Sequence, residues 1–309
     1  MKKLVIILAA FLNLGVNYSW AEGNINSSNV RYVKAPRFAR PLIEKWISEY
    51  SKTHPNVEFQ ISKGAKSQNP SDLSVVIDNN DKNHYNANNV IFFGETAVLP
   101  ITARSSEAER VLEGKHLNNK KLKQLFFLND DFEEDVKKNK SFEQLTIYSG
   151  SNASSVANSF ANYFGVESNS FRGKRISGDD LNINTALLND PLGVSFNTLS
   201  NIYDLENRHL KKDISIIGLD LKKEIANKLE NSGTLDDVLN ILEKEKTTEV
   251  AIEKVGVTYK NFDEEVNKFL QWILTDGTKY NHQYGLLNLD KKNAETEIGK
   301  INNILTLQK

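Results

Sequence analysis

Patterns typical of strands and of amphipathic helices alternate along almost the whole chain of 309 residues. Short runs rich in valine, isoleucine and phenylalanine are separated by longer segments in which apolar residues recur every three or four positions. Strands are expected at 29–33, 57–61, 73–77, 90–93, 97–101, 145–148, 193–196 and 214–219. Helices are expected at 41–52, 117–127, 156–164, 222–231, 235–246 and 262–275. This alternation predicts α/β layers built on open sheets, in which ligands bind outside the carboxyl ends of the strands.

The first residues are typical of a secretory signal peptide. Lys2 and Lys3 precede an apolar run over 4–14, and small residues occupy the −3 and −1 positions of a cleavage site before Glu22. The run is too short for a membrane span, and no later segment approaches the roughly 20 apolar residues that a span needs. Removal of 1–21 is therefore expected to leave a soluble periplasmic protein. Because the chain holds no cysteine, neither a lipid anchor nor a disulfide is expected.

The charge of the chain argues against a nucleic-acid partner. The formal net charge is −1, and removal of Lys2 and Lys3 changes it to −3. Basic clusters such as 120–121 lie close to acidic clusters such as 130–131, so the sequence contains no long basic stripe that could follow phosphates. These charge runs are interpreted as solvated faces.

Sequence signals of catalysis are missing. The five histidines are scattered, and no pair has the spacing of metal ligands. Neither a Gly-x-Ser-x-Gly nucleophile elbow nor a Ser-x-x-Lys with its supporting motifs occurs. The adjacent pairs Asp179-Asp180 and Asp236-Asp237 do not face each other on a helix, so they are interpreted as helix caps. We therefore expect no enzyme activity, no metal and no cofactor.

The segment 145–165 combines a strand, a hydroxyl-rich loop and an amphipathic helix. Val156, Phe160 and Phe164 repeat at helical spacing behind the loop 149–155. Hydroxyls and free backbone N–H groups in this loop would lie at a helix N-terminus, where the helix dipole favours negative charge. The alternative is an N-cap with spare serines. The candidate ligand-binding residues of this loop are Ser149, Ser151, Asn152, Ser154 and Ser155.

A second candidate site follows the first expected strand. Lys34, Arg37 and Arg40 precede a proline, the residue preferred at the first helical position. The helix dipole disfavours cations at this end, so either these side chains point into solvent or an anion lies among them. The loop 62–67 after the next strand has a similar mix of glycine, serine and lysine, and it adds Lys63 as a candidate.

Five segments occur along the chain in a characteristic order. They are 37–46 (RFARPLIEKW), 95–106 (ETAVLPITARSS), 117–127, 190–204 (DPLGVSFNTLSNIYD) and 269–289 (FLQWILTDGTKYNHQYGLLNL). Together they resemble the substrate-binding proteins of phosphate ABC transporters, a branch of the type II periplasmic binding proteins. The resemblance covers nearly all of the chain after the signal peptide. It depends on the order and spacing of the segments rather than on any single motif.

The resemblance implies a two-lobed α/β fold of the type II periplasmic binding proteins, with two open sheets flanked by helices and joined by crossover strands. It places lobe I at 22–98 and 205–309, and lobe II at 99–204. Such a protein is a monomer that closes its lobes by a hinge motion around phosphate or a similar oxyanion. It then delivers the ligand to an ABC permease in the inner membrane.

The family's site can be carried onto individual residues. Arg37 stands where the family usually has a hydroxyl residue, Phe38 supplies a backbone N–H, and Asp78 is near the residue that accepts a proton from the ligand. Three features depart from the family: Tyr148 replaces an arginine common before the loop, 149–155 lacks a Ser-Gly-Thr run, and the segment 63–70 is shorter than the family's helix there. Arg37 can replace the missing cation, because a guanidinium suits phosphate geometry. The alternative function is an interaction or sensor module with a degenerate ligand site.

Overall fold

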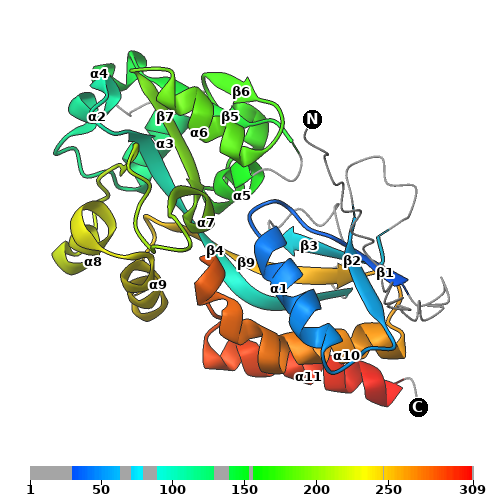
Figure 1. The fold of residues 1–309 in the computed structure, drawn as a ribbon. Helices are drawn as coiled ribbons and strands as arrows, with labels where there is room; N and C mark the ends of the chain where they lie inside the picture. Colours follow the sequence, from blue (N-terminus) through cyan, green and yellow to red (C-terminus); the bar gives the residue numbers. More distant parts are fainter. Residues whose placement is uncertain are drawn as a thin grey trace, which may run out of the picture.

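The computed structural model describes residues 30–62, 71–78, 89–128, 139–152, 156–245 and 247–307 (Figure 1). The strands are β1 (Val30–Lys34), β2 (Glu58–Ile61), β3 (Leu73–Ile77), β4 (Val90–Ala103), β5 (Thr146–Gly150), β6 (Lys174–Ile176), β7 (Gly193–Thr198), β8 (Ile214–Ile216) and β9 (Ala251–Tyr259). The helices are α1 (Arg40–Ser51), α2 (Glu107–Leu112), α3 (Asn119–Phe126), α4 (Lys140–Glu143), α5 (Val156–Tyr163), α6 (Asp180–Leu188), α7 (Leu199–Ile202), α8 (Lys223–Asn227), α9 (Leu235–Lys244), α10 (Glu264–Trp272) and α11 (Lys291–Leu307).

The long strands β4 and β9 run through the middle of one continuous sheet (Figure 1). The strand order is β2-β1-β3-β9-β4-β7-β5-β6, and β8 pairs with β4. The first part of β4 is antiparallel to β9, and its last part is antiparallel to β7. The parallel groups β2-β1-β3 and β7-β5-β6 therefore lie on opposite sides of the two long strands. The expected α/β class and two-lobed arrangement are confirmed, with the two expected sheets hydrogen-bonded into one.

Both long strands differ from the sequence-based prediction. The two short strands expected at 90–93 and 97–101 are both parts of β4. Glu95 between them exchanges two backbone hydrogen bonds of 2.9 Å with Leu287, which keeps the chain extended. β9 is not among the expected strands, since Glu253 and Lys254 interrupt its apolar run. Its ladders with β3 and β4 satisfy the backbone of β9 on both edges.

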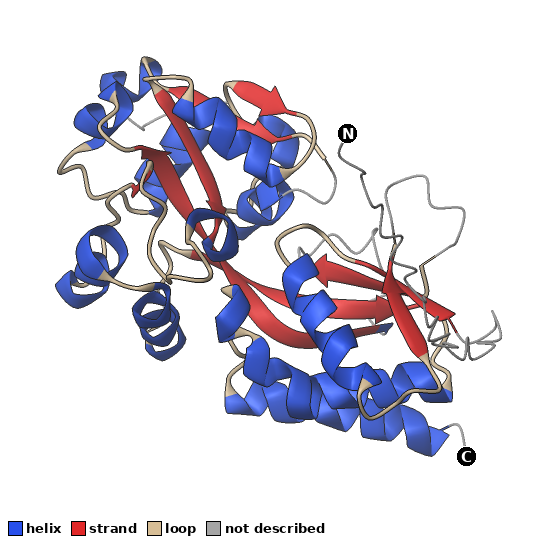
Figure 2. Cartoon of the chain, viewed as in Figure 1, coloured by secondary structure: helices blue, strands red, loops and turns tan. Residues whose placement is uncertain are grey.

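Each half of the sheet has its own hydrophobic core, covered by helices (Figure 2). On one side, Trp46 of α1 is fully buried, and Phe59 and Phe269 stack with their ring centroids 4.1 Å apart. On the other side, Phe160 of α5 stacks on Phe196 of β7, also at 4.1 Å. We call the elements packed on the first core lobe I and those packed on the second core lobe II.

The stretch from β8 to the start of β9 packs on lobe II. Its buried side chains include Ile214, Ile225, Leu239 and Val250, and all of them belong to the core of β7 and α5. The resemblance places this stretch in lobe I through the range 205–309. The last elements of the chain, α10 and α11, contribute Phe269 and other apolar side chains to the core of lobe I.

Side-chain caps define where several helices begin. Asp179 caps α6 by accepting the backbone N–H of Leu181 at 3.0 Å. Thr234 and Asp237 form a reciprocal capping box at the start of α9. The interpretation of the two aspartate pairs as caps is confirmed for Asp179 and Asp237. Each such cap satisfies a backbone donor that the first turn of a helix leaves free.

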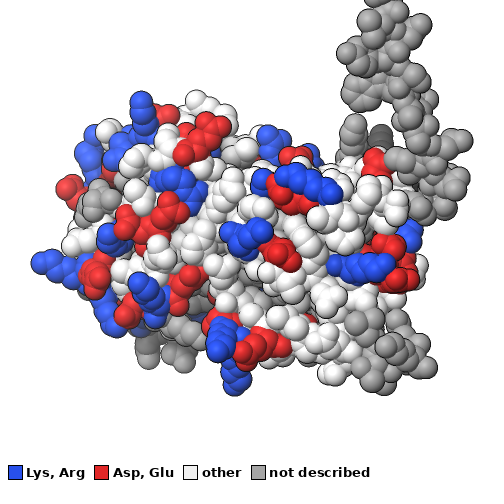
Figure 3. Space-filling model, turned by 60° about the horizontal axis from the view of Figure 1, so that its bottom comes forward, with Lys and Arg blue, Asp and Glu red and all other residues white. Residues whose placement is uncertain are grey.

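The surface carries charges of both signs. Figure 3 shows basic and acidic side chains intermixed over the face that it presents, without a field of one sign. Within the described ranges, no helix combines the length and the apolar character that crossing a bilayer requires.

Candidate functional site

A side chain from the loop before α1 meets the N-terminal ends of α5 and α6 between the lobes. Arg37 lies in the loop between β1 and α1, and its Nε is 3.3 Å from Oδ2 of Asp179, the N-cap of α6. The next residue, Asp180, accepts a hydrogen bond of 3.1 Å from the backbone N–H of Val156, the first residue of α5. We call Arg37, Val156, Asp179 and Asp180 the interlobe site. Lobe I contributes its cation, and lobe II contributes its carboxylates.

The electrostatics of the interlobe site favour negative charge. The N-terminus of a helix carries a partial positive charge of roughly half an elementary charge, and Arg37 adds a full positive charge. Asp179 and Asp180 bring two carboxylates to the same place, where they bind the guanidinium and a helix N–H. The site therefore suits an anion, and the carboxylates of Asp179 and Asp180 provide the negative charge there.

The predicted ligand loop after β5 is bonded to the end of β6 and the loop that follows it. Ser151 donates from its backbone N–H and from Oγ to the carbonyl oxygen of Ile176, at 3.0 and 3.2 Å. Asn152 donates from Nδ2 to the carbonyl oxygen of Gly178. Ser149 is fully buried, and its Oγ has no hydrogen-bond partner among the described residues. These donors of Ser151 and Asn152 are thus used inside lobe II.

The loop after β1 holds donors that are not used in this way. The side chain of Phe38 is buried in lobe I, while its backbone N–H bonds to no residue in the described part of the chain. Arg40, the first residue of α1, has a buried Nε that finds no partner within those same ranges. From sequence, Arg40 is only one of three cations before the helix, because its burial depends on the tertiary fold. Three further candidates, Lys63, Ser154 and Ser155, lie outside the described residues.

Asp78 belongs to a group of carboxylates beside the long strands. Its backbone N–H donates to the carbonyl oxygen of Lys254 at 2.7 Å, which extends the pairing of β3 with β9. Burial, together with the charges of Asp78 and Glu95, raises the pKa of Glu253 to about 8. The negative charges of Asp78 and Glu95 therefore disfavour ionisation of Glu253. Within the described ranges, no three histidine, cysteine, aspartate or glutamate side chains are placed to hold a metal ion.

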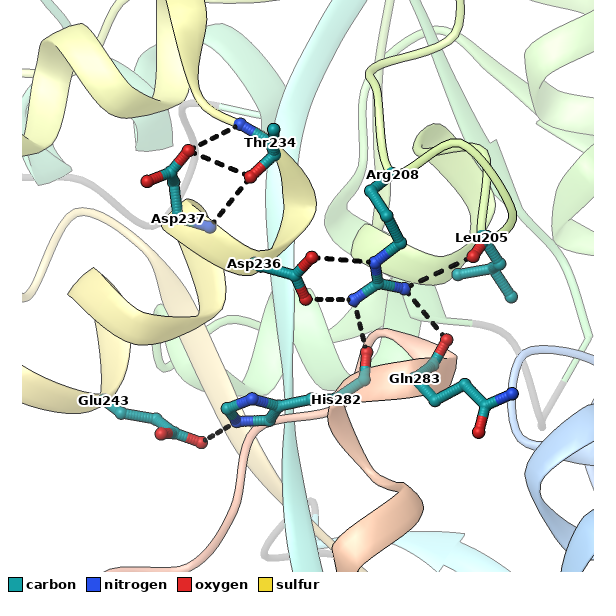
Figure 4. A network of polar contacts seen from close by, with 8 residues as sticks. All are labelled: Leu205, Arg208, Thr234, Asp236, Asp237, Glu243, His282 and Gln283. Carbon is teal, nitrogen blue, oxygen red and sulfur yellow. Dashed lines mark hydrogen bonds and ion pairs between the residues drawn. The ribbon is translucent and has the colours of Figure 1, made fainter.

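A second set of polar contacts also joins the lobes (Figure 4). Arg208 donates to both carboxylate oxygens of Asp236, at 2.6 and 3.1 Å, and to the carbonyl oxygens of His282 and Gln283. Nε2 of His282 lies 2.7 Å from Oε1 of Glu243 in α9. Asp236 and Glu243 belong to a helix packed on lobe II, whereas the chain around His282 packs largely on lobe I. These contacts connect α9 to the C-terminal part of lobe I.

No protein-family model and no curated protein matches the chain. Solved structures do share its fold. One is a protein from Clostridium perfringens assigned as a phosphate ABC transporter substrate-binding protein and crystallised with phosphate. It has a TM-score of 0.53 at 15% identity, covering 85% of this chain and 100% of its own. Another is an ABC-type phosphate transport receptor from Vibrio cholerae, with a TM-score of 0.54 at 10% identity, covering 84% of this chain and 100% of its own. Identity this low shows the fold alone, so the conclusion is that the chain has the α/β fold of the type II periplasmic binding proteins.

Proposed function

We propose that this chain is an exported, periplasmic solute-binding protein that takes a small oxyanion between its lobes and delivers it to an ABC permease. The observation that carries the proposal is the meeting of Arg37 with the N-terminal ends of α5 and α6 at the interlobe site. Phosphate is the first candidate, because the two structures above are described as phosphate-binding or phosphate-transport proteins. The proposal includes no enzyme activity. We propose that the chain passes from lobe II back to lobe I near Ala251, because the stretch before β9 packs on lobe II.

The donors proposed for the anion come mainly from lobe I. Arg37 and Arg40 offer guanidinium groups. The backbone N–H of Phe38 is proposed as a further donor, because no described residue accepts it. Asp78 is proposed to accept a hydrogen bond from the protonated oxygen of an oxyanion such as hydrogen phosphate. A carboxylate can make that bond only to a ligand that carries a proton, which disfavours sulfate.

Calorimetry with inorganic phosphate tests the proposal. The protein is unfolded and refolded to remove bound ligand, and sulfate serves as the control anion. Saturable binding of phosphate at one site is expected. Arg37→Gln is expected to weaken it more than ten-fold, since a hydrogen bond to a charged group is worth roughly 1.5–3 kcal/mol. Arg110→Gln removes an exposed arginine from α2 and provides the matched control, which should leave the affinity unchanged.

One observation favours a second candidate function. Ser151, Asn152 and Val156 already direct donors to protein acceptors, so these described groups of lobe II are not free for a ligand. A binding-protein fold of this kind can serve as an interaction or sensor module with a degenerate site. Absence of both heat and thermal shift with phosphate and with sulfate would reject the transport proposal and favour this module.

A further inference from the structure

The ion pair of Arg37 with Asp179 bridges the two lobes directly. Arg37 is anchored beside Phe38 and Ala39, which are buried in the core of lobe I. Asp179 begins α6, whose Leu187 is buried in the core of lobe II. The 3.3 Å contact therefore ties together two bodies whose own cores are separate. Opening the lobes at this point requires the contact to break.

The same contact uses the groups that an anion needs. Arg37 is the cation proposed for the ligand, and its side chain is 62% exposed, so it is held by this pair rather than by packing. Asp180 in turn occupies the backbone N–H of Val156 at the start of α5. An incoming oxyanion has to displace one or both carboxylates before it reaches these donors.

We propose that Asp179 is an autoinhibitory competitor of the ligand: it holds Arg37 and keeps the lobes together while the site is empty. This inference rests on the proposed function for the competition, but the latch between the lobes can be measured without any anion. A carboxylate resembles half of a tetrahedral oxyanion in charge and in its paired acceptors, which is why both suit a guanidinium. The competition sets the anion affinity lower than the donors alone would allow.

The variant Asp179→Asn separates the charge of Asp179 from its role as a cap. Asparagine caps helices as well as aspartate does, so α6 keeps its first hydrogen bond. Asp213→Asn is the matched control, because Asp213 is an exposed aspartate before β8 and its loss changes the net charge equally. The chain has no cysteine, so spin labels can be placed on Glu44→Cys in α1 and Thr185→Cys in α6, both exposed positions.

The distance between the two labels is measured first in ligand-free protein. A narrow distribution is expected for the otherwise unaltered chain and for Asp213→Asn, and a broader, longer one for Asp179→Asn. Salt of about 0.5 M should shift the distance distributions of the unaltered chain and of Asp213→Asn toward that of Asp179→Asn, because screening weakens an exposed ion pair. Phosphate affinity is then measured by calorimetry. Asp179→Asn is expected to bind about two- to five-fold more tightly, the range that an exposed ion pair allows.

The outcomes separate the two proposals. An unchanged label distance in Asp179→Asn overturns the latch, whether or not phosphate binds. A longer distance without any tightening of measurable phosphate binding overturns the competition. A longer distance in a protein that binds no anion supports the latch while rejecting the transport proposal.

Discussion

The imidazole of His282 and the carboxylate of Glu243 join the two lobes through a single contact of 2.7 Å between Nε2 and Oε1. The same carboxylate oxygen accepts the backbone N–H of Asn288 at 2.6 Å, so one atom of α9 holds two groups of the C-terminal segment. Glu243 thus acts as a shared acceptor at the place where Figure 4 shows α9 meeting this segment.

Removal of this acceptor charge is expected to destabilise the fold in a pH-dependent way. Burial by itself raises the pKa of Glu243, but the hydrogen bonds from His282 and Asn288 outweigh it and hold the pKa below its usual 4.5. A lowered pKa contributes stability above the usual pKa, which is lost as the pH falls through the folded value. Glu243→Gln should therefore cost about 1 kcal/mol at neutral pH, and the difference from wild type should shrink below about pH 4. Urea unfolding at several pH values measures this, and a pH-independent difference would contradict it.

The hydrogen-bonding geometry of the Arg208 guanidinium is expected to contribute more to stability than its positive charge alone. It bonds to Asp236 and to three backbone carbonyls, a set that a lysine ammonium cannot satisfy in the same geometry. Arg208→Lys should lower the free energy of unfolding by about 2 kcal/mol. Asp236→Asn should cost less, about 0.5–1 kcal/mol, because Asp236 is half exposed and the carbonyl contacts remain. Urea midpoints with unchanged slopes provide the test, and an equal or larger effect of Asp236→Asn would reject the ranking.

Glu253 is expected to reduce stability at alkaline pH. An acid with a pKa raised on folding keeps its proton in the folded chain after the unfolded chain has lost it. Folding therefore becomes less favourable as the pH rises from about 4.5 to about 8. Glu253→Gln should be several kcal/mol more stable than wild type at pH 8 and close to it at about pH 4, because each pKa unit of the shift corresponds to about 1.4 kcal/mol. The exposed Glu107→Gln in α2 serves as the control. If Glu253→Gln is no more stable at pH 8 than at pH 4, relative to wild type, the burial of a protonated carboxyl is excluded.

A comparison of two glycines distinguishes the cost of backbone strain from the cost of a steric contact between the lobes. Gly285 and Gly165 have φ of 75° and 68°, a region that costs a residue with a Cβ about 1 kcal/mol. A Cβ at Gly165 would meet nothing within 4 Å, whereas one at Gly285 would lie 3.1 Å from the backbone nitrogen of Ser200 in α7. Gly165→Ala should therefore cost about 1 kcal/mol and Gly285→Ala distinctly more. Thermal and urea unfolding of the pair decide the point, and equal losses would show that the Ser200 contact adapts freely.

Several elements could be predicted from local pattern because their signals are local. The spacing of Leu42, Trp46 and Ile47 predicts a helix at 41–52, and α1 spans Arg40–Ser51. The polar break around Glu95 predicts two strands, and here the prediction is wrong. The groups that keep β4 continuous there belong to β9 and Leu287, far along the chain. No window around residue 95 contains that information.

The features of the candidate site also fall into two groups, those that depend on local sequence and those that depend on tertiary packing. The sequence alone determined that cations precede α1, that hydroxyl and amide side chains follow β5, and that Asp179 is a cap, because each depends on neighbours within a few residues. Tertiary structure alone decided that Arg37 meets Asp179, that Asp180 takes the N–H of Val156, and that Ser149 is buried. Periodicity and capping act over one or two turns of chain, whereas an ion pair forms wherever the packing of two separate cores brings opposite charges within about 4 Å.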